Sequence, residues 1–173
     1  MQWKKTTITT DFISEGVATG DINRDGKMDI VAGYFWFEAP DWKRHEIYPS
    51  RIFDPKKEYS NSFLNLCMDV NLDGLTDIVL IDFPGNISFW LENPGGKGGD
   101  WKRYVIGDSI GIANESPGFV DIDGDGRLDL LCGDLKVRQM IWLQAPVKKG
   151  QTNWTRYPVS ATNFASEIGR AHV

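Results

Sequence analysis

Acidic residues recur at a fixed spacing in three short segments of this chain. The most complete segment covers residues 121–129, with aspartates at its positions 1, 3, 5 and 9 and a glycine at position 6. Side chains at positions 1, 3 and 5 can converge on one point if the backbone curls around it. The glycine permits the turn that brings the carbonyl oxygen of position 7 to the same point. A set of oxygen ligands of this number suits Ca²⁺ better than zinc or copper.

The same arrangement begins at Asp21 and at Asp69, so three acidic loops (residues 21–29, 69–77 and 121–129) start 48 and then 52 residues apart. We predict one Ca²⁺ per loop, about three in all, with ligands at positions 1, 3, 5, 7 and 9. These ligands are Asp21, Asn23, Asp25, Lys27 and Asp29; Asp69, Asn71, Asp73, Leu75 and Asp77; and Asp121, Asp123, Asp125, Arg127 and Asp129. The alternative is that each Asp-Gly pair only marks a hairpin turn, which would explain positions 5 and 6 but not the acids at 1, 3 and 9.

The residues that follow the acidic loops distinguish between calcium architectures. An EF-hand loop needs a bidentate glutamate at position 12 and flanking helices, whereas position 12 is here Ala32, Leu80 or Cys132. A dockerin-like module also needs a ligand near position 12 and a helix after it. Each acidic loop is instead followed by a short run of Val, Ile and Leu that ends at a turn, which is typical of a buried strand. The acidic loops are therefore predicted to join β-strands.

The acidic loops belong to a longer unit of about 50 residues that is repeated three times. Each unit has an apolar strand before the loop, one after it, an aromatic strand that ends in proline, and a closing strand that starts with tryptophan. Six of the seven tryptophans occupy two positions of this unit: Trp36, Trp90 and Trp142 in the aromatic strands, and Trp42, Trp101 and Trp154 in the closing strands. We expect these side chains to pack between the units, because large aromatic residues usually serve core burial; the alternative is that they form platforms for carbohydrate binding.

Four short antiparallel strands in about 50 residues correspond to one propeller blade. The predicted fold is therefore all-β, a partial β-propeller of three four-stranded antiparallel blades within one domain over residues 1–167. Residues 3–9 match the closing strand with no unit before it and are predicted as an orphan N-terminal strand. The predicted blades cover residues 16–50, 62–108 and 116–160.

In these features the chain resembles the FG-GAP/VCBS-type repeat proteins, a family of calcium-loop β-propellers that is also found in integrin α-subunit heads. The resemblance covers about residues 3–160, and the acidic loops are its specific part. The Phe-Gly and Gly-Ala-Pro signatures are absent as such, with partial echoes at Gly33, Gly133, Ala39-Pro40 and Ala145-Pro146. That places the chain nearer the bacterial VCBS-like branch. Because members usually close seven blades, the resemblance implies a fragment of a seven-bladed propeller, with the remaining blades of the parent chain as its partners.

The C-terminal residues 168–173 can be back-translated onto the opening of a common sequencing adapter, followed in frame by a stop codon. We hypothesise that these residues are not biological and that the reading frame is truncated. The alternative is an ordinary frayed tail.

Composition and charge exclude several classes of protein. A hydrophobic content of 41% excludes a disordered chain, no apolar run approaches a membrane span, and no basic stripe is present to bind nucleic acid. The net charge of −5 has a local source, since ten of the 24 acidic residues lie in the acidic loops, and three Ca²⁺ would bring the total to about +1. No signal peptide is visible at the N-terminus. Cys67 and Cys132 form no disulfide framework and are expected to be buried free thiols.

The first function that the sequence favours is a non-catalytic calcium-binding module, a scaffold or ligand-binding part of a larger exported protein. Extracellular or periplasmic localisation follows because extracellular modules with such loops hold calcium at about 10⁻⁴–10⁻³ M. The second is the propeller portion of a sugar-converting or hydrolytic enzyme. The chain has no Gly-x-Ser-x-Gly, His-Glu-x-x-His or P-loop motif, so no catalytic residue is predicted. His45 stands where Tyr104 and Tyr157 stand in the other units and is predicted to be a strand residue.

The third function is integrin-like adhesion to a protein or carbohydrate ligand. Two connectors, residues 48–62 and 107–117, are longer than a blade needs and are predicted to lie on the face opposite the acidic loops. Lys56 and Glu115 are the connector residues chosen to test ligand binding. The alternative is that both connectors are solvated loops without a partner.

Overall fold

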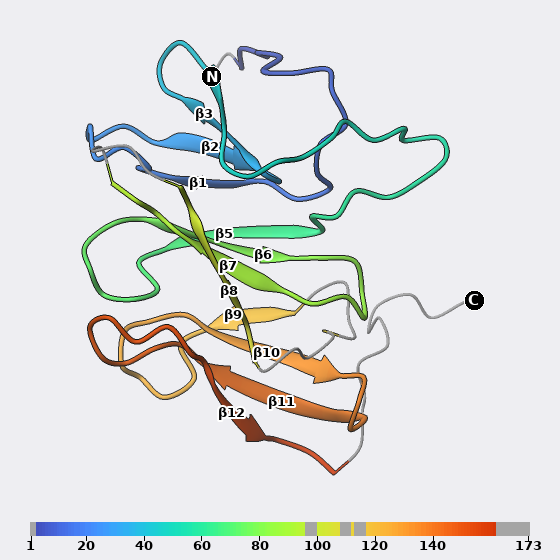
Figure 1. Cartoon of the computed structure of the whole chain (residues 1–173), viewed down its shortest axis with the longest axis vertical. Helices are drawn as coiled ribbons and strands as arrows, with labels where there is room; N and C mark the ends of the chain where they lie inside the picture. The colour runs from blue at the N-terminus through green and yellow to red at the C-terminus, as the bar shows by residue number, and fades with distance from the viewer. Residues whose placement is uncertain (1–2, 96–99, 108–111, 113–116, 162–173) are drawn as a thin grey trace.

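The described part of this computed structural model, residues 3–95, 100–107, 112 and 117–161, is all-β (Figure 1). Its strands form three antiparallel sheets of four strands, each in chain order. The first sheet contains β1 (Ala18–Gly20), β2 (Asp29–Ala32), β3 (Phe35–Glu38) and β4 (Lys43–Glu46). The second contains β5 (Leu64–Met68), β6 (Asp77–Ile81), β7 (Phe89–Glu92) and β8 (Lys102–Val105). The third contains β9 (Gly118–Val120), β10 (Asp129–Asp134), β11 (Gln139–Gln144) and β12 (Thr155–Pro158).

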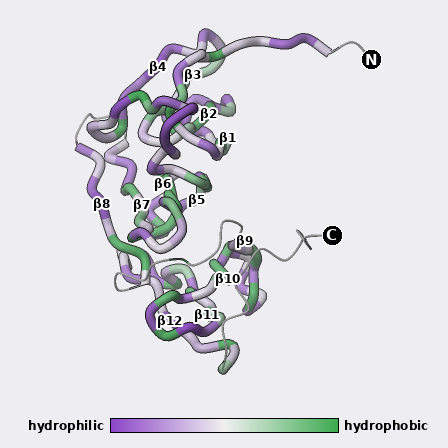
Figure 2. The backbone as a smooth tube through the Cα atoms, turned by 90° about the vertical axis from the view of Figure 1, so that its right-hand side faces the viewer, coloured by the Kyte–Doolittle hydropathy of each residue, from purple (hydrophilic) through white to green (hydrophobic). Residues whose placement is uncertain are grey.

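The three sheets follow one another along the long axis of the molecule (Figure 1). Seen from the side, the chain describes an arc, with β1, β5 and β9 toward its inner side and β4, β8 and β12 toward its outer side (Figure 2). The predicted all-β fold of three four-stranded antiparallel units is thereby confirmed, and the arrangement is consistent with consecutive propeller blades.

The core lies between neighbouring sheets, and the second sheet contributes to both layers. Strand β6 is buried along its whole length, and four apolar residues follow the aspartate with which it begins. Its two faces serve different neighbours, because side chains alternate along a strand. Ile78 and Leu80 pack with Val31 of the first sheet, together with Phe89 and Leu91 of β7. The other face joins the third sheet in a cluster of Val79, Ile81, Trp90, Leu130, Cys132, Ile141 and Leu143.

The tryptophans pack mainly between the sheets, as expected. Trp90 is fully buried and Trp154 nearly so, both in the cluster between the second and third sheets. Trp36 and Trp101 are partly buried against the cluster between the first and second sheets. The other two tryptophans of the repeat unit are also partly buried. Trp42 packs against the cluster that contains Phe35 and Phe37 of the first sheet, and Trp142 stacks on Tyr157 of the third sheet.

The prediction of a strand over residues 3–9 is wrong in this structure. These residues form no strand, and Trp3 is 90% exposed. The physical reason is that an isolated strand leaves its backbone groups without ladder partners, and no described strand pairs with this segment. The chain instead reaches the outer face of the first sheet further along, where Ile13 is buried against Phe35 and Phe37. The segment around Ile13 thus covers one face of the first sheet, and the second sheet packs on the other face.

Several other sequence predictions can be compared with the structure. Cys67 lies in β5 and Cys132 in β10; both are free thiols whose pKa burial raises to about 12. Among the residues that the structure describes, no membrane-spanning helix is found. The tail at residues 168–173 and Glu115 of the second connector lie outside the described residues.

The layered core gives a direct stability prediction. Replacing Leu80 by Ala removes a fully buried side chain from the layer between the first and second sheets. The expected loss of unfolding free energy is about 2–4 kcal/mol, measured by urea denaturation. The matched control, Leu135→Ala, changes a side chain that is 48% exposed and should cost no more than about 0.5 kcal/mol. Equal losses in the two variants would show that Leu80 is not a packed core residue.

Candidate metal centres

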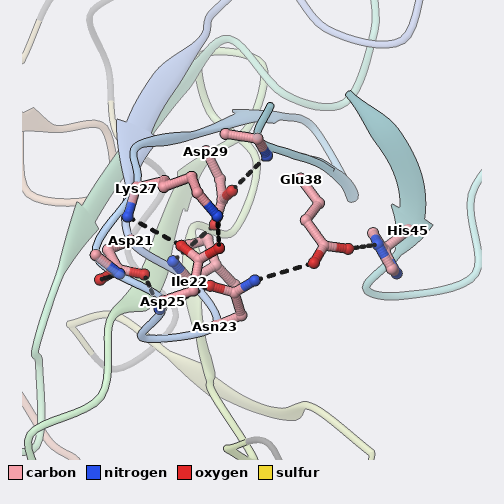
Figure 3. A network of polar contacts seen from close by, with 10 residues as sticks. Asp21, Ile22, Asn23, Asp25, Lys27, Asp29, Glu38 and His45 are labelled. Carbon is pink, nitrogen blue, oxygen red and sulfur yellow. Dashed lines mark hydrogen bonds and ion pairs between the residues drawn. The ribbon is translucent and has the colours of Figure 1, made fainter. Parts of the chain in front are cut away.

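The three acidic loops join the first and second strands of their sheets, and no helix flanks them in the described chain, as predicted. In the first loop the side chains fold back onto the backbone (Figure 3). Asp21 accepts hydrogen bonds from the N–H groups of Asp25 and Gly26, both at 3.0 Å. Asn23 Oδ1 accepts from Asp25 N–H at 3.0 Å, and Asp25 Oδ1 accepts from Lys27 N–H at 2.9 Å. These bonds curl the loop around the side chains of positions 1, 3 and 5.

The other two loops repeat this conformation. The position 1 aspartate again accepts hydrogen bonds from the backbone N–H groups of positions 5 and 6. Asp69 accepts from Asp73 and Gly74. Asp121 accepts from Asp125 and Gly126. The position 6 glycines have φ angles of +82°, +90° and +86°, a region that side-chain-bearing residues rarely adopt. The glycine at position 6 is therefore required by the backbone, as the sequence indicated.

The aspartates at position 9 have a structural role that their spacing does not reveal. Asp29, Asp77 and Asp129 are almost fully buried, with exposures of 0%, 0% and 1%. Each accepts two backbone hydrogen bonds, one from position 2 of its own loop and one from the residue that follows the third strand of its sheet. The donors are Ile22 (3.0 Å) and Ala39 (2.8 Å), Val70 (2.9 Å) and Asn93 (2.8 Å), and Ile122 (3.3 Å) and Ala145 (2.9 Å). Position 9 thus fastens each acidic loop to the end of the third strand, which lies at the same end of the sheet.

The electrostatics of position 9 are clearest in the second loop. Burial raises the pKa of Asp77 to about 7, while hydrogen bonds from Asn93 and Val70 act in the opposite direction and the charges of Asp73 and Asp69 add to the rise. A cation bound among these carboxylates would favour the ionised form of Asp77, because an opposite charge stabilises the charged state.

Three predicted ligands of the third loop lie close together. Oxygens of Asp121, Asp123 and Asp129 lie within 4.8 Å of one another. This donor set contains only oxygen, which fits a hard cation such as Ca²⁺ and does not fit metals that prefer nitrogen or sulfur ligands. The carboxylate of each of these residues also retains free lone pairs, since a carboxylate offers about four acceptor sites.

The side chains at position 7 differ between the loops in their contacts. Lys27 forms an ion pair with Asp25 of its own loop, with 2.7 Å between Nζ and Oδ2, and the bond lowers the pKa of the Asp25 carboxyl. Leu75 is apolar and lies near Gly95. Arg127 reaches the second loop, where its Nη2 donates to the carbonyl oxygens of Asp69 and Val70 at 2.9 Å each.

Further bonds connect the loops in series along the arc. Asn93 Nδ2 donates to the carbonyl of Ile22 in the first loop at 2.8 Å and to that of Thr76 in the second at 2.9 Å. Gly150 N–H, in the segment between β11 and β12, donates to the carbonyl of Asn71 at 2.7 Å. The second loop is therefore held from both sides, and the loops are not independent appendages.

Three residues at these sites were missed by the sequence reasoning: Glu38, Glu92 and Gln144. Each ends the third strand of its sheet and contacts the side chain at loop position 3. The sequence does hold a signal for them, because all three stand two residues after a tryptophan and two before a proline. His45, predicted as a strand residue, lies in β4, where its ring stacks on Trp36 and its Nε2 lies 2.7 Å from Glu38 Oε2.

The side of the sheets opposite the acidic loops carries an aromatic cluster of Tyr59, Phe63 and Phe83. Neighbouring ring centroids lie 5.2–5.6 Å apart. Tyr59 belongs to the connector over residues 48–62, which lies on the opposite side from the acidic loops in Figure 1, as predicted. Tyr59 is 65% exposed and Phe83 39% exposed, although aromatic rings usually serve core packing.

Comparison with known protein families agrees with this architecture. The family model described as FG-GAP-like repeat matches residues 69–132, which run from the start of the second acidic loop into β10. The chain thus contains an FG-GAP-like repeat over these residues, in agreement with the resemblance inferred from its sequence. No curated protein and no solved structure matches the chain significantly.

The structural role of position 9 can be tested without any metal. In Asp129→Asn the amide replaces one acceptor oxygen with a donor, so one buried N–H loses its partner, at an expected cost of about 1–3 kcal/mol. The matched control is Asp125→Asn in the same loop, where Asp125 Oδ1 accepts from Arg127 N–H and an amide oxygen can do the same. The measurement is urea denaturation of both variants in EDTA. Equal losses would contradict the role assigned to position 9.

Proposed function

We propose that the chain is a non-catalytic repeat module whose three acidic loops bind Ca²⁺ and are stabilised by it. The observation that carries the proposal is the shared loop conformation, in which side-chain oxygens of positions 1 and 3 are gathered over one backbone curl in all three sheets. Position 5 contributes a further aspartate to each loop. Calcium would be held by these side chains, by the free lone pairs of position 9 and by the position 7 carbonyl.

The charge of the loops supports a stabilising role for the cation. Each loop gathers at least three carboxylates, which repel one another until a cation neutralises them. Because the ligands are brought together only in the folded chain, calcium binding stabilises the folded state by mass action. In the first loop Lys27 already neutralises part of this charge, which supports a weaker site there than in the third loop.

The expected affinity supports an exported parent protein. Extracellular modules of this type hold calcium at about 10⁻⁴–10⁻³ M, a concentration that is present outside the cytosol. We propose that the module serves as a scaffold or ligand-binding part of such a parent, with further blades covering the ends of the arc.

Calcium is expected to raise the thermal stability of the full chain. With a dissociation constant near 10⁻⁴ M, 10 mM CaCl₂ would add about 2.7 kcal/mol for each occupied site. The melting temperature should therefore rise by roughly 5–10 °C per occupied site, measured by differential scanning calorimetry. Sodium chloride of equal ionic strength is the control for charge screening. The triple variant Asp21→Asn, Asp69→Asn and Asp121→Asn should lose the response, and an unchanged melting temperature of the wild type in CaCl₂ would contradict the proposal.

The exposed aromatic cluster supports a second candidate function, adhesion to a carbohydrate or protein ligand. Contiguous exposed apolar groups often mark interaction sites, and aromatic side chains dominate the energetics of many interfaces. The cluster joins the first connector to the turn between β6 and β7, so one surface would combine residues of two chain segments.

This candidate is tested by measuring binding of the full chain to glycan arrays and matrix proteins. Tyr59→Ala should weaken the binding at least about 10-fold, as expected for an aromatic residue at the centre of an interface. Trp3→Ala is the matched control, because Trp3 is an exposed aromatic residue outside the cluster. Equal binding by wild type and Tyr59→Ala would exclude the cluster as the ligand site.

A further inference from the structure

The side chain at loop position 3 contacts the last residue of the third strand in every sheet. Asn23 Nδ2 donates to Glu38 Oε1 at 3.2 Å, as Figure 3 shows. Asn71 Nδ2 donates to Glu92 Oε1 at 3.1 Å. In the third sheet the pair is Asp123 and Gln144, with 2.5 Å between Oδ2 and Nε2. The contact therefore recurs three times, over sequence separations of 15, 21 and 21 residues.

The direction of this hydrogen bond reverses between the sheets. An ionised carboxylate only accepts hydrogen bonds, whereas a side-chain amide donates through its nitrogen. In the first two sheets the loop carries the amide and the strand carries the carboxylate. In the third sheet the loop carries the carboxylate and the strand carries the amide. The donor and the acceptor have thus exchanged places while the contact is kept.

Both forms of the pair leave an oxygen of position 3 turned into the loop. Asn23 Oδ1 and Asn71 Oδ1 each accept from the N–H of position 5 at 3.0 Å. Asp123 Oδ1 does the same at 3.2 Å. For the two asparagines the bond to glutamate fixes which end of the amide is the NH₂ group, and in Asn71 this group also donates to Asp73 Oδ2 at 3.1 Å. A rotated amide would turn that NH₂ group, which cannot bind a cation, toward the predicted site.

The strand residue is itself held by the outer strand. His45 Nε2 lies 2.7 Å from Glu38 Oε2, and Tyr104 donates its hydroxyl to Glu92 Oε2 at 3.0 Å. Tyr157 donates to Gln144 Oε1 at 3.4 Å. Each of these rings stacks on the tryptophan of the neighbouring third strand, with ring centroids 4.2–4.7 Å apart. In Glu38, Glu92 and Gln144, one polar atom of the side chain thus contacts the loop and the other contacts a ring of the fourth strand.

We propose that Glu38, Glu92 and Gln144 are positioning residues of the three metal sites. Each one directs an oxygen of position 3 to the cation, and the reversal keeps four carboxylates at every site. The four are Asp21, Asp25, Asp29 and Glu38; Asp69, Asp73, Asp77 and Glu92; and Asp121, Asp123, Asp125 and Asp129. This inference rests on the proposed binding of calcium.

The third site allows a test by exchange of donor and acceptor. The full chain is used with Asp21→Asn and Asp69→Asn, so that only the third site titrates, and calcium affinity is measured by isothermal titration calorimetry. In this background Asp123→Asn should weaken calcium binding at least about 10-fold, the usual size of an effect on a metal ligand or its hydrogen-bond partner. Adding Gln144→Glu rebuilds the pair of the first two sheets and should restore the affinity to within about threefold of the starting protein.

The matched control replaces Gln144 by Asp instead of Glu in the Asp123→Asn protein. It adds the same charge on a side chain that is one methylene shorter and cannot make the same contact. Rescue by glutamate but not by aspartate would support the proposal. Rescue by both would show that charge alone acts, and rescue by neither would show that the pair has no positioning role; either result would overturn the proposal.

A measurement in EDTA separates this inference from the proposed function. Without metal, Gln144→Glu places two carboxylates against each other and should lower the melting temperature, and adding Asp123→Asn should restore it. If the starting protein bound no calcium, both the proposed function and the role of the Asp123–Gln144 pair in metal binding would be overturned. The restored melting temperature in EDTA would then still establish the hydrogen-bonded pair. If calcium bound normally but the exchange had no effect in either measurement, only the positioning role would be overturned.

Discussion

A buried aspartate that accepts two backbone hydrogen bonds holds each acidic loop in place. Asp29, Asp77 and Asp129 each connect position 2 of a loop to the residue after the third strand of the same sheet. These bonds add to the strand ladder in fixing the loop relative to the strand that carries its partner residue. Position 9 thereby supports the placement of position 3 against Glu38, Glu92 or Gln144. A buried carboxylate with its acceptors satisfied is tolerated where an unpaired one would be costly.

The acidic loops and the core support each other through the second sheet. Its strand β6 packs against both neighbouring sheets, and it begins with Asp77, the position 9 residue of the second loop. Asn93 and Arg127 then connect the second loop to the first and third. A cation in one loop would consequently stabilise a structure that its neighbours share. This geometry explains why a calcium-dependent repeat would be built from several loops in series.

Much of this organisation could be predicted from the sequence, because it depends on local spacing. Three or four acids and a glycine within nine residues define each loop, and the Val- and Ile-rich run after Asp29 or Asp77 defines the strand that follows it. The bonds to Ala39, Asn93 and Ala145 could not be predicted, since they depend on the register between strands up to 16 residues apart. The role of Glu38 was missed for the same reason. Residues 3–9 were misjudged because a strand pattern predicts a strand only where a partner exists.

The central claim is that a divalent cation occupies each acidic loop, and diffraction from crystals grown with CaCl₂ tests it most directly. The account predicts an anomalous difference peak in each of the three loops, with side-chain oxygens of positions 1, 3 and 5 at about 2.3–2.6 Å from the ion. Peaks of this kind would also show whether position 9 contributes an oxygen while keeping its two backbone bonds. Loops with no peak at millimolar calcium, or ions found only elsewhere on the surface, would contradict it.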